Sequence, residues 1–172
     1  WAFTDVFVIG TTGVWVTALS GLLYMTAMYF YLRALQHEEA STIAPLFQTS
    51  TLFTYAIAYF VLRETLTLER IAGGLLVMAS ALVISYDPRH RHKFKLPTLL
   101  LILACTATLA VSAVIFKLFA IKDAFWPVTF WTFAGEAVFG AVMLAVPYYR
   151  REFIGMFAKN PGAVIGINAA NE

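Results

Sequence analysis

Residues 32–47 read LRALQHEEASTIAPLF, a short polar segment with long apolar sequence on both sides. Residues 6–32 contain no charged side chain, and residues 40–62 contain none either. A helix that crosses the roughly 30 Å hydrocarbon core of a bilayer needs about 20 such residues. The segment therefore predicts a turn between two membrane-spanning helices.

The triplet His37-Glu38-Glu39 in this turn also resembles half of a zinc site. Zinc proteases carry HExxH on a helix, with two imidazoles on one face. Here the residue four positions after His37 is Ser41, so the second imidazole is absent. We interpret the triplet as a solvated turn and expect no metal site.

The composition extends the membrane interpretation to the whole chain of 172 residues. Hydrophobic residues make up 60%, aromatic residues 16% and charged residues 13%, with a mean hydropathy of +0.76. These values lie far outside those of soluble domains. The net charge is +2, and the twelve basic residues are confined to short breaks, which excludes a nucleic-acid surface. The single Cys105 excludes a disulfide framework.

Apolar runs and proline positions together predict an all-α, multi-pass transmembrane bundle. Sequential helices joined by such short breaks are expected to pack as antiparallel neighbours. Pro45 lies a full turn inside the second run, so that helix either starts near Ala44 or bends. Five spans and the start of a sixth are predicted, at 9–35, 42–63, 68–86, 97–121, 126–148 and from 161.

Small residues mark the face on which the first helix packs. Gly13, Thr17 and Gly21 form one stripe, and helices in lipid associate through close contact of small residues.

The positions of lysine and arginine suggest how the chain is oriented in the membrane. Eight of these residues lie after the first, third and fifth spans, and four lie after the other two. That count places the first set of breaks in the cytoplasm.

Charged residues inside the apolar runs are the first candidates for chemistry. Glu136 lies near the middle of the fifth span, and Lys117 lies near the end of the fourth. A charge at this depth is costly and must face a cavity or a partner. A substrate or proton site is one interpretation, and a structural ion pair or a lysine reaching the interface is the other.

Polar and aromatic side chains supply further candidates for a cavity lining. Tyrosines near a membrane end also serve as interfacial anchors, so both interpretations stay open for them. The basic run DPRHRHKFK at 87–95 is interpreted as a cytoplasmic loop rather than a metal or nucleic-acid site. The cavity candidates besides Glu136 and Lys117 are Tyr24, Met28, Gln48, Tyr55, Tyr59, Asn168 and Asn171.

Four motifs in order resemble an EamA-type repeat of the drug/metabolite transporter superfamily. They are AL at 34–35, EASTIAPL at 39–46, LRETLT at 62–67 and IAGGLLV at 71–77, and the match extends over about 20–86. Arg63 replaces a glycine that usually precedes the glutamate, an exchange expected to matter little. Family members are described with cytoplasmic termini, which would reverse the orientation from the charge count.

The resemblance implies a ten-helix transporter of two inverted five-helix repeats, with the substrate cavity between the repeats. Residues 1–86 would be the last three helices of the first repeat and 87–96 a basic inter-repeat loop. Residues 97–172 would hold the first two helices and the start of the third helix of the second repeat. Glu136 would then lie outside the helices that usually line the cavity.

The expected function is a permease of the plasma membrane that moves a small organic metabolite, such as an amino acid or related compound, by alternating access. We expect neither a cofactor nor a nucleic-acid partner, and we expect the protein to lie in the lipid bilayer. Coupling of transport to protons is possible on this interpretation and is left undecided. The alternatives are an intramembrane enzyme and a helical membrane scaffold without transport. An enzyme would require an acid-base or nucleophile pair at membrane depth, for which Lys117 and Glu136 are the nearest candidates.

Overall fold

Every regular element in the described part of the chain is an α-helix. The computed structural model describes residues 9–63, 67–85, 96–122, 125–159 and 162. The chain divides into two compact units, Trp1–Glu136 and Ala137–Glu172, and α6 has residues in both. The helices are α1 (Thr11–Leu35), α2 (Ala40–Phe47), α3 (Thr49–Leu62), α4 (Leu68–Ser85), α5 (Leu96–Lys122), α6 (Phe125–Ala145) and α7 (Pro147–Lys159).

Three of these helices, α1, α5 and α6, are long and apolar enough to cross a membrane, and α3 is a shorter apolar helix. The predicted all-α, multi-pass bundle is therefore confirmed. The predicted sixth span lies outside the described residues except for Gly162.

The second predicted span is divided into α2 and α3. The helix begins at Ala40, before Pro45, and is interrupted at Gln48. Proline removes a backbone donor and its ring crowds the carbonyl four residues earlier, so an interior proline bends or breaks a helix. Of the two alternatives left by the sequence, the structure excludes a start near Ala44, and the interruption lies three residues after Pro45.

Helix α7 occupies a segment that the sequence analysis treated as a connection. Pro147 stands at its first position, where the missing N–H costs nothing, and Lys159 lies in its last turn, where a cation complements the helix dipole. Hydropathy alone detects long apolar spans and overlooks a short helix with charges along it.

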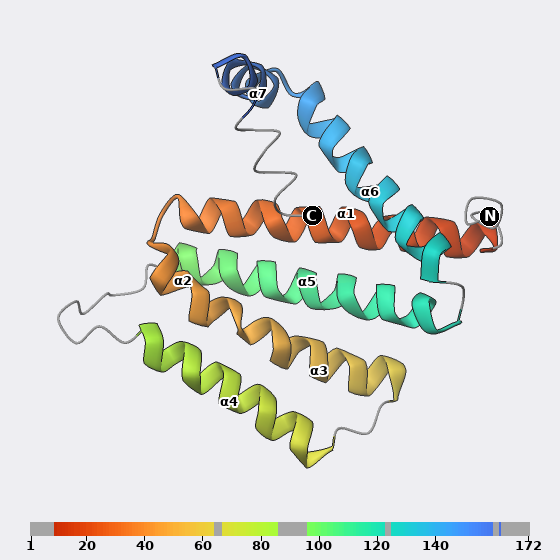
Figure 1. Cartoon of the computed structure of the whole chain (residues 1–172), viewed down its shortest axis with the longest axis vertical. Helices are drawn as coiled ribbons and strands as arrows, with labels where there is room; N and C mark the ends of the chain where they lie inside the picture. The colour runs from red at the N-terminus through yellow and green to blue at the C-terminus, as the bar shows by residue number, and fades with distance from the viewer. Residues whose placement is uncertain (1–8, 64–66, 86–95, 123–124, 160–161, 163–172) are drawn as a thin grey trace. The chain divides into compact units, whose positions relative to one another are not determined.

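The helices of the first unit are not arranged in chain order. Helix α5 packs against both α1 and α3 and lies between them, and α4 packs against α3 (Figure 1). The prediction that sequential spans pack as neighbours is therefore wrong for α1 and α3. The short helix α2 provides the reason, because it contacts α1, α4 and α5 and carries the chain past the end of α5 before α3 begins.

The buried face of α1 consists of small residues, whereas large apolar side chains such as Trp15 and Leu32 are exposed. The predicted stripe of Gly13, Thr17 and Gly21 is confirmed, since all three are buried. This arrangement is typical of helices in lipid, where close approach drives association. The complete buried set on α1 is Gly13, Thr17, Ser20, Gly21, Ala27 and Ala34.

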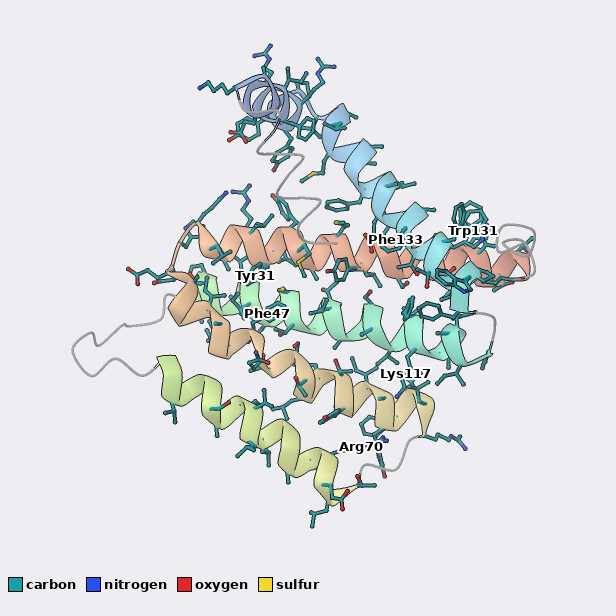
Figure 2. All side chains as sticks on the ribbon, in the orientation of Figure 1. Tyr31, Phe47, Arg70, Lys117, Trp131 and Phe133 are labelled. Carbon is teal, nitrogen blue, oxygen red and sulfur yellow. The ribbon has the colours of Figure 1, made fainter. Side chains whose placement is uncertain are left out.

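A small apolar cluster closes the end of the first unit at the turn between α1 and α2. Ala34, Ile43 and Ile102 form its buried centre. The rings of Tyr31 and Phe47 pack beside it, with centroids 5.1 Å apart (Figure 2). The polar turn between α1 and α2 thus lies beside an apolar contact between α1, α2 and α5.

Candidate functional site

Helices α1 and α6 touch through their backbones at two glycines. A Cβ added at Gly21 would collide with the backbone carbonyl oxygen of Thr132, and one added at Gly135 would collide with the carbonyl oxygen of Ala18. The contact is reciprocal, because each helix presents a glycine to a carbonyl of the other. Such close crossings allow weak Cα–H···O contacts as well as dense packing.

A group of hydroxyls joins α1, α5 and α6 beside this crossing. Ser112 Oγ of α5 donates a hydrogen bond to the backbone oxygen of Ser20 in α1, at 2.8 Å. Ser20 Oγ donates to the Thr17 oxygen at 2.7 Å, and Thr132 Oγ1 donates to the Val128 oxygen at 2.9 Å. Ser20 Oγ and Thr132 Oγ1 lie 3.5 Å apart. Ser112 therefore bonds α5 to α1, and the hydroxyls of Ser20 and Thr132 lie close to each other where α1 and α6 cross.

A cavity of about 250 Å³ lies against these hydroxyls, entirely within the first unit. Its volume is slightly below the range for small-molecule sites, which is about 300–1,000 Å³. The lining residues are Tyr24 of α1, Leu109, Ser112, Ala113 and Phe116 of α5, and Thr132 and Glu136 of α6.

The cavity combines an apolar wall with a few polar groups. Glu136 is the single charged residue of the lining, and Tyr24 and Phe116 contribute aromatic rings. A mostly apolar pocket with convergent polar groups is the usual form of a small-ligand site. The arrangement can hold a small organic molecule by its apolar surface and orient it through Glu136, Ser112 and Thr132.

Two of the residues proposed from sequence, Tyr24 and Glu136, meet in this cavity. Met28 lies one turn beyond Tyr24 on α1 and is partly buried. Lys117 follows Phe116 in sequence but does not belong to the lining. It is exposed, and Figure 2 shows it on the side of α5 that faces α3.

The other sequence candidates lie elsewhere. The ring of Tyr55 packs over Gly74 of α4, and Tyr59 is an exposed residue whose ring touches that of Phe60. Gln48 stands at the interruption between α2 and α3. Asn168 and Asn171 lie outside the described residues.

Sequence reasoning did not identify Ser112, Thr132 or Phe116 as lining residues, nor Gly135 as a contact. A usable signal was present, because a hydroxyl inside an apolar span faces a protein neighbour or a cavity more often than lipid. The pairing of Gly21 with Gly135 had no such signal, since it depends on which faces of α1 and α6 meet.

Comparison with known proteins supplies one match. A sequence model of the EamA-like transporter family matches residues 1–86, which is half of the chain. No curated protein and no solved structure matches. The matched half contains α1 to α4, and thus one wall of the cavity.

Proposed function

Because this chain belongs to the EamA-like transporter family, we propose that it carries a small organic metabolite, an amino acid or related compound, across the plasma membrane by alternating access. Membership of that family and the long apolar helices make it an integral membrane protein of a transporter family. The single observation that supports the finer proposal is the cavity between α1, α5 and α6.

The location of the cavity fits a transporter of two repeats. We propose that residues 1–86 end a first repeat and residues 97–172 begin a second, with 87–96 as the loop between them. On that division, α1 belongs to the first repeat and α5 and α6 to the second, so the cavity lies between repeats. Substrate sites of repeat-based transporters lie at this kind of interface.

The glycine crossing supports a mechanism for alternating access. Gly21 and Gly135 bring the backbones of α1 and α6 into contact directly beside the cavity. A contact without side chains lets two helices rock against each other while they remain touching, because no side chain has to change its rotamer. We propose that the two repeats rock about this point around a bound substrate.

Proton coupling would depend on Glu136, the single lining carboxyl group. Intramembrane carboxyls of transporters commonly serve as proton carriers. We expect an imposed pH gradient to stimulate uptake by the wild-type protein and not by Glu136→Gln. Equal stimulation of both proteins would exclude Glu136 as the proton site.

Flux in proteoliposomes of the complete protein tests the proposal. A panel of labelled amino acids and related metabolites should include at least one substrate. Ala113→Phe, which fills the cavity, should strongly reduce its uptake. Ala104→Phe is the matched control, because Ala104 lies on the same helix, is exposed and does not line the cavity.

Two results would contradict the proposal. One is the absence of flux for the whole panel with a folded protein. The other is uptake that Ala113→Phe leaves unchanged, which would place the transport path elsewhere.

A further inference from the structure

The hydroxyls of the cavity are arranged so that they accept hydrogen bonds. A serine or threonine hydroxyl has one hydrogen and two lone pairs. Ser112 gives its hydrogen to the backbone oxygen of Ser20, and Thr132 gives its hydrogen to that of Val128. Both residues also belong to the lining of the cavity. A ligand donor that reaches either hydroxyl therefore meets its lone pairs.

Glu136 adds acceptors of the same kind and, in its ionised form, a negative charge. An ionised carboxylate only accepts hydrogen bonds, and its two oxygens offer about four lone-pair positions. It can therefore keep a contact within the protein and still bind a ligand donor. Three of the four polar residues of the lining, Ser112, Thr132 and Glu136, thus accept, and the fourth is Tyr24.

The aromatic residues of the lining favour the same class of ligand. Tyr24 of α1 and Phe116 of α5 belong to the wall of the same small cavity as Glu136. The face of an aromatic ring attracts a cation, and this attraction strengthens where water is excluded. A ring and a carboxylate in one cavity complement a positively charged group that also donates hydrogen bonds.

From these groups we infer that the cavity recognises a small organic molecule through a protonated amino group. The ammonium hydrogens point to Glu136, Ser112 and Thr132, and the ring of Tyr24 covers the charge. The inference rests on the proposed transport function and specifies its substrate class. Carboxylic acids without an amino group should bind poorly. The lining has no cation to pair with their carboxylate, and its three acceptors face the carboxylate with further lone pairs.

Three probes of matched shape test the inference by direct binding. They are 2-phenylethylamine, 2-phenylethanol and 3-phenylpropanoate, which carry a cation, a neutral hydroxyl and an anion on the same ring and chain. Calorimetry uses the complete protein in nanodiscs of neutral lipid, with empty nanodiscs as the blank. We expect the amine to bind about tenfold or more tightly than the alcohol, and the acid to bind most weakly.

Variants then assign the preference to named groups. Glu136→Gln keeps the size of the side chain and should remove the advantage of the amine, because the affinity of the amine falls much more than that of the alcohol. Glu136→Asp keeps the charge and should retain part of the advantage. Tyr24→Phe should retain the preference, whereas Tyr24→Leu should reduce it, because only the ring face is needed.

Several outcomes would overturn the inference. They are equal affinity for the amine and the alcohol, tightest binding of the acid, or an amine preference that survives Glu136→Gln. If Glu136→Gln does not fold, the order of the three probes on the wild-type protein still decides. Flux without amine preference would refute this inference alone, and amine binding without flux of any panel compound would refute the transport proposal alone.

Discussion

The contact region of α1, α5 and α6 and the pair of α3 and α4 differ in how closely their helices pack. In the first, the buried residues are mainly glycine, alanine, serine and threonine. In the second, large apolar residues such as Phe60 and Leu76 are more than two-thirds exposed, at 78% and 72%. In lipid, large apolar side chains gain little from leaving the membrane, so the tight region depends on small residues and hydroxyls.

The candidate site also lies in one of these two regions. The cavity, the hydroxyl group and the glycine crossing all belong to the region of small residues. Small residues bring the helices close together beside an open cavity that has polar residues in its lining. The α3 and α4 pair has large side chains where those helices would meet further protein or lipid.

The largest contrast between the regions is expected for truncation of a large apolar residue. Ile102→Ala removes a side chain that is 1% exposed in the cluster with Ala34 and Ile43, and should cost about 2–5 kcal/mol of unfolding free energy. Leu76→Ala on α4 should change it by less than about 0.5 kcal/mol. Unfolding of both variants in detergent measures the difference, and equal losses would refute the division into tight and loose regions.

Replacement of glycine by alanine usually stabilises a helix, but at two glycines of this protein it should destabilise the fold. Gly21→Ala or Gly135→Ala places a Cβ against a backbone carbonyl, which cannot rotate away, and should cost about 1–3 kcal/mol.

Gly73→Ala on α4 is the matched control, since a Cβ there meets nothing within 4 Å. It should be neutral or stabilise the helix by up to about 1 kcal/mol. A Gly21→Ala protein as stable as Gly73→Ala would show that the close crossing does not exist.

Loss of a single hydroxyl should also destabilise the fold, by a smaller amount. Ser112→Ala removes the hydrogen bond from α5 to the Ser20 oxygen and should cost about 0.6–1.7 kcal/mol, the range for hydrogen bonds between membrane helices. Ser80→Ala should have almost no effect, because Ser80 is exposed and donates within its own helix to Val77. Thermal unfolding of the two variants side by side provides the measurement.

The smallest expected change is a gain at the end of α3. Arg63 adopts a left-handed conformation with φ 51° and ψ 33°, which costs a residue with a Cβ about 1–2 kcal/mol. The glycine usual at this place in the family avoids that cost, so the position matters more than the motif comparison suggested. After the extra entropy of glycine is subtracted, Arg63→Gly should stabilise the protein by about 0.5–1 kcal/mol. A decrease in the unfolding temperature would contradict this account.

Much of the fold was accessible from sequence, and the site less so. Helix borders at α1, α4 and α5 follow from apolar length, and the small-residue stripe on α1 predicted its packing face. Tyr24 and Glu136 were selected because a polar group inside a span needs a partner or a cavity. Ser112 and Thr132 were overlooked although a hydroxyl inside an apolar span is a signal. A hydroxyl can also bond within its own helix, as Thr132 does with Val128, and the sequence does not separate such residues from Ser112, which bonds to another helix.

By itself, the sequence determined that the chain crosses a membrane, where its principal helices lie, and that the chain turns within LRALQHEEASTIAPLF, although the structure limits the turn to residues 36–39. Only the tertiary structure decided that α5 lies between α1 and α3, and that Gly21 meets Gly135. The physical reason is that the helices lie in lipid rather than in water. In lipid the faces of a helix are mostly apolar, so hydropathy reveals the length of a helix but not which helix packs against it. The neighbouring helix is decided by close contact between residues that are distant in sequence.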